Sequence, residues 1–470
     1  MNELLTLTLI ELAEALRERK ASPVELMEAT LARIDEVNGD LNAVVAMHDR
    51  GRLLDAAREA EARIARGEAR PLEGIPLGVK DLEDTEGLVT SMGSLPFKDR
   101  VATQDTTQVA RLKAAGAIVL GKTNAPEFGY TAITKNLVYG VTRSPWNLER
   151  TPGGSSGGSA AALTSGMLPL VTSSDGGGSI RIPASFTGAF GLKVSFGRVP
   201  TGPSDLWSSD DTAVSGPTTK TVEDAALFLD QVAGPSPCDP NSLPHPGISY
   251  LDAVRSDAPG RLRIAYSPDL AYAVVQTDVA EAVFDGVKAF EKLGHSVEEI
   301  AGGPPPMALA WGRYGGFELA AKLHPYLPRY EQEFGRGFLA GVKLGWEMTP
   351  EEFGDQERQR AILNRWCADL FDAYDVLVTP TVPYDPPPAK GPFPTETEGR
   401  RQPIASVASF TIPFNLSWHP AASVRVGLSR AGLPIGMQIV GPRHREDLVL
   451  QVARAFERER PWHPTWPTSW

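Results

Sequence analysis

Hydrophobic positions recur along most of the chain with the spacings of buried helices and strands. Residues 22–37 begin with a serine N-cap and a proline at the first helical position, and their apolar residues follow a helical spacing, which predicts a helix. A second helical pattern at 51–65 leads into residues 75–81, whose short apolar run predicts a buried strand. These patterns predict two helices and a strand that follows the second of them.

The alternation of helical and strand patterns continues to the far end of the chain. In chain order we predict helix 107–116, strand 117–123, helix 223–234, strand 262–267, helix 278–294, strand 375–381, strand 433–441 and helix 446–459. Two proline-rich stretches, 234–247 and 383–403, are predicted to be surface loops because ordered patterns resume on both sides of each. This alternation is typical of the α/β class.

Composition excludes several classes of function. The chain has 470 residues, 42% of them hydrophobic, so it can bury a large core. A formal net charge of −12 argues against nucleic acid as the main partner. No stretch approaches the ~20 apolar residues that span a bilayer, and the N-terminus lacks the apolar region of a signal peptide. We therefore expect a cytoplasmic protein that has no membrane partner.

The two cysteines, Cys238 and Cys367, have neither metal-ligand spacing nor the density of a disulfide scaffold. We expect both to be unpaired thiols in a reducing compartment. They give no indication of a metal site.

Two short motifs match known templates without the context that those templates need. Residues 116–123 fit the phosphate-binding P-loop pattern, but the four residues between its glycines are aliphatic and favour a buried strand. Residues 153–157 fit the nucleophile elbow of α/β-hydrolases, but a polar, proline-containing stretch precedes them instead of a strand. A Ser-His-Asp hydrolase that uses His419 or His444 stays open as an alternative, although His444 fits better as a solvated residue at a helix start.

A glycine-rich turn offers the parts of an acyl-transfer site. Three glycines come directly before Ser179: Gly176, Gly177 and Gly178. Such a backbone can bring several N–H groups around one point and form an oxyanion hole beside the serine hydroxyl. Ser179 could then be a nucleophile if a nearby group took its proton. No histidine is close in sequence, and Lys80, at the end of an apolar run, is the lysine best placed for burial. Taken alone, however, the position of Lys80 is explained better by a lysine at the end of a strand whose side chain reaches solvent than by a buried base.

The same region resembles the amidase signature family of serine amidohydrolases. The likeness covers nearly all of residues 153–200, and it extends over these further stretches: 71–81, 116–129, 142–154 and 414–441. It implies one large α/β domain, residues 1–470, with a central mixed β-sheet covered by helices on both faces and with neither metal nor organic cofactor. Within that domain it implies four regions: N-terminal helices 1–70, a signature core 71–200, a variable substrate-lining region at about 300–400, and C-terminal strands and a helix at 403–460.

The resemblance also implies a Ser-cisSer-Lys triad. Lys80 corresponds to the family's base, Ser155 to the middle serine that follows a cis peptide bond, and Ser179 to the nucleophile. Neutral Lys80 would take a proton from Ser155, and Ser155 would take one from Ser179, while N–H groups of residues 176–179 hold the oxyanion.

Three neighbouring residues are predicted to support this triad. Ser156 is similar to a second family serine that helps to hold the relay, although it could simply cap the following helix. Asp175 and Arg181 flank the nucleophile, and we predict that they brace its loop through charge-assisted hydrogen bonds.

Five aromatic or imidazole residues are candidates for lining the substrate pocket. Trp311, Tyr314 and Phe317 recur at helical spacing. Core packing explains most aromatic residues in this region, and we expect some of these three to contact an apolar or aryl substrate. Trp418 and His419 occupy positions where the family has small residues, so we expect them at the pocket, with ordinary packing of Trp418 as the alternative.

The sequence thus predicts an amidohydrolase that cleaves C–N bonds of small to medium apolar amides and acts as a monomer or homodimer. Amides, anilides, carbamates and esters share a tetrahedral intermediate, and the sequence does not rank them. The alternative is the amidase subunit of a tRNA-dependent amidotransferase, which needs a partner subunit, but the C-terminal part is more similar to free-standing amidases. A catalytically silent binding protein is disfavoured because all three triad positions are filled.

Overall fold

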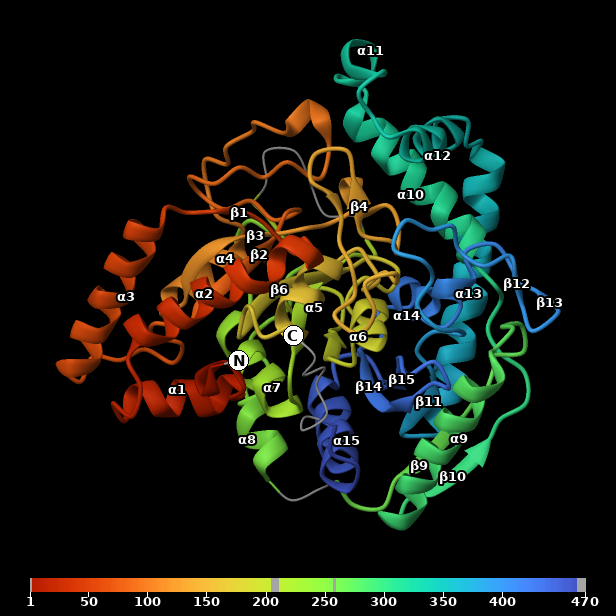
Figure 1. Ribbon diagram of the computed structural model, residues 1–470. Helices are drawn as coiled ribbons and strands as arrows, with labels where there is room; N and C mark the ends of the chain where they lie inside the picture. The colour runs from red at the N-terminus through yellow and green to blue at the C-terminus, as the bar shows by residue number, and fades with distance from the viewer. Residues whose placement is uncertain (1, 204–210, 257–258, 463–470) are drawn as a thin grey trace.

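One 11-stranded sheet organises the computed structural model, which describes residues 2–203, 211–256 and 259–462 (Figure 1). From edge to edge its strands are β1 (Val44–Met47), β3 (Ile118–Thr123), β2 (Pro76–Lys80), β6 (Leu170–Asp175), β8 (Val214–Thr219), β7 (Phe190–Lys193), β14 (Ala421–Leu428), β15 (Pro434–Val440), β11 (Val376–Pro380), β9 (Arg263–Tyr266) and β10 (Ser296–Glu299). Four neighbouring pairs, β3–β2, β2–β6, β11–β9 and β9–β10, are parallel, and the others are antiparallel. The sheet is therefore mixed, as expected.

Helices lie on both faces of this sheet. In chain order they are α1 (Leu9–Arg17), α2 (Pro23–Leu41), α3 (Arg50–Ala65), α4 (Thr107–Ala114), α5 (Gly157–Thr164), α6 (Arg181–Thr187), α7 (Val222–Val232), α8 (Tyr250–Arg255), α9 (Thr277–Lys292), α10 (Ala308–Leu323), α11 (Leu327–Tyr330), α12 (Arg336–Trp346), α13 (Pro350–Ala373), α14 (Ile412–Leu416) and α15 (Glu446–Glu459). Two small hairpins, β4 (Lys135–Asn136) with β5 (Gly140–Val141) and β12 (Glu396–Thr397) with β13 (Arg400–Arg401), lie outside the sheet.

The alternation of side chains along each strand divides the core into layers. On β6, Leu170 packs in a cluster with α7, α8, α9 and α15, whereas its neighbour Val171 packs in a cluster with α2, α3 and α5. On β3, Val119 and Leu120 divide in the same way. Successive residues of a strand point to opposite faces, so both faces of the sheet are apolar and both need helices to cover them. The predicted α/β fold is confirmed.

The helix predicted at residues 22–37 illustrates how local sequence sets an element's start. Ser22 accepts a hydrogen bond from Val24 N, and the Glu25 side chain accepts one from Ser22 N, so the capping box is formed. The helix runs on to Leu41, where Asn42 ends it in the left-handed conformation. Residues 118–123 form strand β3, as predicted, and not the phosphate-binding loop whose motif they match.

Both predicted loops are confirmed as segments with little regular structure, but the expectation that both lie at the surface is wrong for residues 383–389, most of which are buried. Residues 234–247 contain neither helix nor strand, and residues 383–403 contain only the β12–β13 hairpin. The ends of the predicted domain, residue 1 and residues 463–470, lie outside the described residues.

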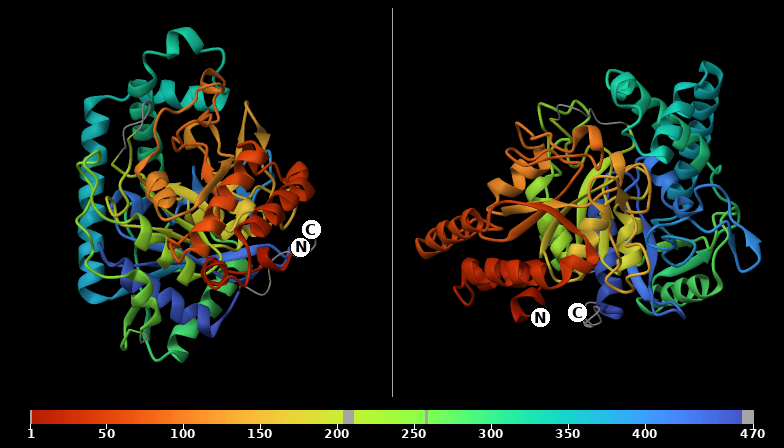
Figure 2. Two further views of the ribbon diagram at one scale, coloured as in Figure 1. Left: turned by 90° about the vertical axis from the view of Figure 1, so that its left-hand side faces the viewer. Right: turned by 45° about the horizontal axis from the view of Figure 1, so that its top comes forward.

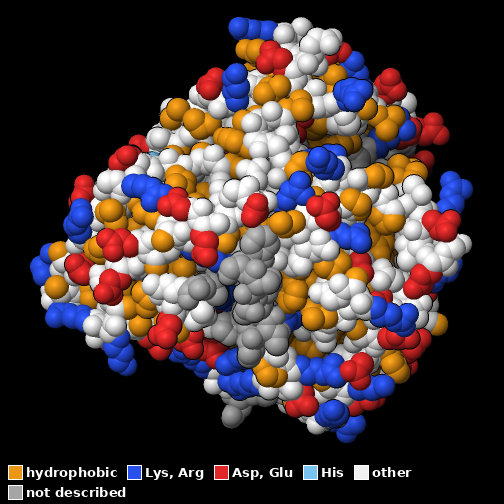
Figure 3. Space-filling model, in the orientation of Figure 1, with side chains coloured by type: hydrophobic (Ala, Val, Ile, Leu, Met, Phe, Trp, Pro, Cys, Tyr) orange, Lys and Arg blue, Asp and Glu red, His pale blue; other side chains and the backbone are white. Residues whose placement is uncertain are grey.

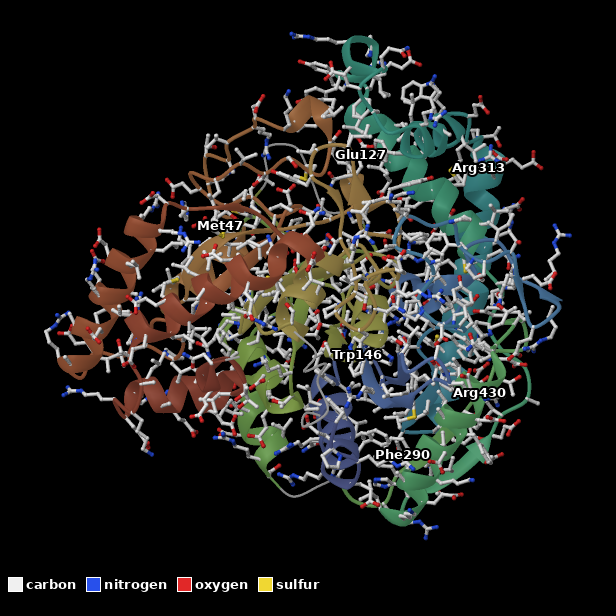
Figure 4. The ribbon with its side chains drawn as sticks, in the orientation of Figure 1. Met47, Glu127, Trp146, Phe290, Arg313 and Arg430 are labelled. Atoms are coloured by element: carbon white, nitrogen blue, oxygen red, sulfur yellow. The ribbon has the colours of Figure 1, made fainter. Side chains whose placement is uncertain are left out.

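Three helices, α10, α12 and α13, form one end of the molecule, opposite α1–α3 (Figure 2, right). An apolar cluster that includes Phe97 and Phe128 of the body and Leu319 and Phe338 of these helices joins them to the rest. Glu127, labelled beside α10 and α12 in Figure 4, strengthens the junction, because it accepts hydrogen bonds from Ser94 Oγ at 2.6 Å and from Gly335 N at 2.9 Å.

The surface carries charges of both signs. Acidic and basic side chains are interspersed over the face drawn in Figure 3, with apolar side chains between them. Among the helices of the described residues, none is both long and apolar enough to cross a bilayer.

The close contact between α5 and the segment after β3 can be tested with two glycine variants. A Cβ at Gly158 would overlap the backbone N and O atoms of Asn124, so we expect Gly158→Ala to lower the free energy of unfolding by about 1–3 kcal/mol. Gly39, exposed in α2, has no atom within 4 Å of such a Cβ, so Gly39→Ala should raise it by about 0.5–1 kcal/mol. Urea unfolding followed by circular dichroism measures both, and equal midpoints for the two variants would contradict the contact.

Candidate active site

Lys80 ends strand β2 and points into the protein. Its side chain is fully buried, and Nζ lies 2.8 Å from Ser155 Oγ, 2.8 Å from Ser156 Oγ and 2.9 Å from Ser174 Oγ. Its backbone N–H donates to Thr172 Oγ1 at 2.9 Å. The alternative of a solvent-exposed lysine is therefore wrong. The inward side chain follows from the position of β2 between two parallel neighbours inside the sheet.

The surroundings of Lys80 favour its neutral form. Burial lowers the pKa of Lys80 from 10.5 to about 7, although the carboxylates of Glu83 and Asp175 act in the opposite direction. At neutral pH a large share of the amine is therefore unprotonated, and it can accept a proton from a neighbouring hydroxyl.

The serines around Lys80 come from two adjacent elements. Ser155 follows the cis peptide bond Gly154–Ser155, and Ser156 occupies the N-cap position of α5. The Ser156 hydroxyl makes no cap hydrogen bond; it donates to the carbonyl oxygen of Ser174 at 3.2 Å and accepts from Ser174 N at 3.3 Å. It thus joins the loop before α5 to strand β6, which agrees with a holding role and corrects the helix-cap alternative.

Ser174 is a contact of Lys80 that the sequence reasoning did not single out. The sequence contains an indication of this contact, because Thr172 and Ser174 are two residues apart on β6 and their side chains therefore share one face of the strand. Thr172 bonds the Lys80 backbone and Ser174 its amine.

A buried ion pair braces the loop that carries Ser179. Arg181 Nη2 and Nε donate to Asp175 Oδ1 and Oδ2 at 2.9 and 3.0 Å, and both side chains are fully buried. Asp175 Oδ1 also accepts from Gly178 N at 2.7 Å and from Asn415 Nδ2 at 2.9 Å, and Oδ2 accepts from Ile180 N at 3.1 Å. The loop is thereby fixed at both ends by one carboxylate.

This ion pair keeps Asp175 ionised. Burial alone would raise its pKa, but the charge and hydrogen bonds of Arg181 and the hydrogen bond of Asn415 outweigh it and hold the pKa well below 3.8. Arg181 Nη1 also donates to Gln438 Oε1 at 2.8 Å and to Thr411 O at 3.0 Å. The sequence reasoning missed these C-terminal partners, although a glutamine within the apolar strand β15 was a usable signal.

The four N–H groups expected in the oxyanion hole are not equivalent. Gly178 has φ +134 and its N–H is bonded to Asp175, which corrects the expectation that it serves the hole. Within the part of the chain that the structure describes, the N–H groups of Gly176, Gly177 and Ser179 donate to no protein acceptor. Three donors can therefore meet an oxygen from a substrate.

The contact between Ser155 and Ser179 is less complete than expected. Ser156 N donates to Ser179 O at 3.3 Å, which keeps the two loops adjacent, and Ser155 and Ser179 both line one cavity. Among the hydrogen bonds of the described residues, however, none joins the two side-chain oxygens. The expected relay is therefore hydrogen-bonded between Lys80 and Ser155, but not between Ser155 and Ser179. Such bonds are often long without substrate and shorten when it binds.

The cavity beside these serines has a volume of about 440 Å³. Much of its wall is apolar and comes from the segments after β2 and β3 and from α10 and α12: Leu82, Met92, Phe128, Trp311, Leu319 and Leu344. The Trp311 ring lies close to Gly177, where a Cβ would come within 2.6 Å of it. Trp146, labelled near the centre of Figure 4, donates from Nε1 to Thr187 O at 2.8 Å and fixes the end of α6.

Of the five candidate lining residues, the structure brings only Trp311 to this cavity. Tyr314 and Phe317 lie on α10 outside its lining, with ring centroids 6.5 Å apart. Trp418 stacks on Phe196 at 4.8 Å and is 38% exposed. These placements correct the expectation that Tyr314, Phe317 and Trp418 contact the substrate. For Tyr314 and Phe317, helical spacing does not specify which neighbour their face meets; for Trp418, the structure supports the alternative of ordinary packing.

Neither His419 nor His444, the histidines of the Ser-His-Asp alternative, reaches this cavity. His419, also expected at the pocket, is buried beside Phe371 instead, and burial lowers its pKa to about 3. His444 is exposed two residues before α15. No histidine of the described residues lines the cavity, which overturns the Ser-His-Asp alternative. Nor do three or more His, Cys, Asp or Glu side chains of the described residues form a group that could hold a metal ion.

The chain is similar to known proteins over nearly its whole length. The family model named Amidase matches residues 25–450. An acylamidase from Rhodococcus erythropolis is 36% identical over 477 residues, which cover 97% of this chain and 96% of that protein. One subunit of the glutamyl-tRNA(Gln) amidotransferase from Roseiflexus sp. (strain RS-1) is 35% identical over 487 residues, 98% of each. A solved bacterial aryl acylamidase superposes with a TM-score of 0.91 at 29% identity, over 97% of each chain.

These matches extend over nearly the whole chain, and they confirm the resemblance that the motifs indicated. The chain belongs to the amidase signature family and is a hydrolase of amide C–N bonds.

Proposed function

We propose that the protein hydrolyses small to medium apolar amides through an acyl-enzyme on Ser179. The observation that supports this most directly is the buried Lys80 amine, whose pKa is lowered to about 7 and which lies 2.8 Å from Ser155 Oγ. Ser179 lines the cavity that Ser155 also lines, and the neighbouring N–H groups of Gly176 and Gly177 have no acceptor among the described residues.

In the proposed mechanism, substrate binding brings the hydroxyls of Ser155 and Ser179 together. Neutral Lys80 accepts the Ser155 proton, Ser155 accepts the Ser179 proton, and Ser179 Oγ attacks the amide carbonyl carbon. The N–H groups of Gly176, Gly177 and Ser179 stabilise the negative oxygen that forms.

The intermediate then breaks its C–N bond. The proton held at Lys80 returns through Ser155 to the departing nitrogen, which leaves as an amine, and the acyl group remains on Ser179. Water attacks this ester along the same relay and releases a carboxylic acid together with the free serine.

Two features support an apolar or aryl substrate. Apolar side chains make up much of the cavity wall, and Trp311 offers a flat ring above the proposed oxyanion hole. The similar solved structure is that of an aryl acylamidase, whose name specifies an aryl amide. Anilides are therefore the first substrates to test.

A second candidate is the amidase subunit of a tRNA-dependent amidotransferase, which the 35% identity to a protein of such an assembly favours. If the chain acts alone, the purified protein should release p-nitroaniline from acyl anilides and elute as a monomer or homodimer. Size-exclusion chromatography together with assays on anilides and on glutamine checks this. Glutamine hydrolysis that needs added partner subunits, with no anilide turnover, would reverse the assignment.

The nucleophile assignment predicts a steep loss in variants of the triad. Ser179→Ala should abolish anilide turnover, and Lys80→Ala and Ser155→Ala should each lower kcat by about 10²- to 10⁴-fold. Ser185→Ala is a matched control, because the Ser185 hydroxyl is buried in α6 without a hydrogen-bond partner among the described residues and outside the cavity lining. It should keep wild-type rates. Steady-state kinetics and mass spectrometry of the trapped acyl-enzyme measure these effects, and turnover by Ser179→Ala would refute the mechanism.

The lysine assignment predicts loss of activity in acid. Because the folded-state pKa of Lys80 is about 7, its neutral form dominates above this pH and declines about tenfold for each pH unit below it. The value of kcat/KM for an anilide should fall accordingly between pH 7 and pH 5. Recovery of full activity after return to pH 8 controls for acid unfolding. A profile that is flat over this range would show that no group with this pKa acts as the base.

A further inference from the structure

Three polar side chains form a distinct part of the otherwise largely apolar cavity wall. Glu83 lies three residues after Lys80, and Thr106 and Gln108 lie at the start of α4. All three line the cavity. Glu83 is 6% exposed and Gln108 is 1% exposed, so both are almost completely removed from bulk solvent.

These side chains retain hydrogen-bonding capacity that the protein does not use. Gln108 Nε2 donates to Glu83 Oε2 at 2.8 Å, which fixes the two groups against each other. Glu83 Oε1, Gln108 Oε1 and Thr106 Oγ1 are buried and have no hydrogen-bond partner among the described residues. Buried polar atoms in folded proteins are nearly always paired, so three unpaired oxygens on residues that line one cavity point to a donor from outside the chain.

The chemistry of the three atoms defines the group that would complement them. The amide oxygen of Gln108 only accepts, a carboxylate oxygen only accepts, and the threonine hydroxyl accepts or donates. Burial raises the pKa of Glu83, whereas its bond from Gln108 and the nearby Lys80 and Lys122 favour the ionised form. Even with Glu83 protonated, two acceptors remain, so the fitting group carries N–H or O–H donors.

We propose that Glu83, Thr106 and Gln108 form a polar subsite that binds a donor group of the substrate, such as a primary amide or an amine, in addition to the scissile amide. This inference rests on the amide hydrolysis proposed above. It narrows the substrate class from apolar amides to amides that carry both an apolar body and a second, hydrogen-bond-donating group.

The test compares matched substrates that differ only in that second group. One pair of p-nitroanilides has a straight acyl chain that ends in methyl or in a primary amide. A second pair has a fixed acyl group and an aniline ring that carries para-methyl or para-carboxamide, so that both sides of the scissile bond are sampled. The readout is the ratio of kcat/KM within each pair, because a ratio cancels differences in active fraction between variants.

Wild-type protein should favour the carboxamide member of at least one pair by about tenfold. Thr106→Val and Gln108→Leu should each reduce that preference about three- to tenfold, the range expected when one hydrogen bond is removed. Thr107→Val is the control, because the Thr107 hydroxyl donates to Gly202 O and does not line the cavity. It should leave the ratio unchanged.

Calorimetric binding of the same four compounds to Ser179→Ala separates the subsite from the chemistry. A binding preference for the carboxamide members that Thr106→Val abolishes supports the subsite even if the proposed hydrolysis fails. The subsite is refuted if wild-type protein favours the methyl member of both pairs, or if Thr106→Val and Gln108→Leu change the preference no more than Thr107→Val does.

Discussion

The site depends on one amine kept away from water without a carboxylate in contact with it. Lys80 touches three hydroxyl oxygens and, among the described residues, forms no salt bridge. Solvent or a close carboxylate would restore its positive charge, and a charged lysine cannot take a proton. The parallel strands β2 and β6 and the start of α5 satisfy this requirement, because together they surround the amine with polar but uncharged groups. The burial of Lys80 also depends on the apolar layers that cover both faces of the sheet.

The two halves of the chain contribute different parts of the site. The N-terminal half supplies the lysine and the serines around it. The C-terminal half acts through the loop of Ser179, because Thr411, Asn415 and Gln438 complete the hydrogen bonds of the Asp175–Arg181 pair. Burying an ion pair costs free energy unless its remaining donors and acceptors also form hydrogen bonds. Here the partners of these hydrogen bonds are residues more than 200 positions away in the chain. The position of Ser179 is thus a property of the whole fold.

Much of this could be predicted from sequence where the cause is local. The capping box at Ser22 and the apolar runs of β2 and β3 reflect interactions within a few residues, and they specified the helix start and the strands. The triad candidates followed from the resemblance to the amidase signature family, which implied the role of each residue. Tyr314 and Trp418 were placed incorrectly because helical spacing and composition do not say which distant element covers a side chain. Gln108 was missed because its unpaired oxygen is visible only when the cavity wall is assembled.

The contact between Trp311 and Gly177 has a consequence for how such an enzyme can diversify. The ring that forms part of the cavity wall also lies against Gly177, whose N–H is one of the donors in the proposed oxyanion hole. In the proposed mechanism, substrate recognition and charge stabilisation therefore share one point of contact. A replacement on α10 that enlarges the chamber at this spot also releases the backbone beneath it, so broader selectivity there is coupled to slower turnover. Lineages that change their preferred acyl group without losing speed must do so elsewhere on the wall.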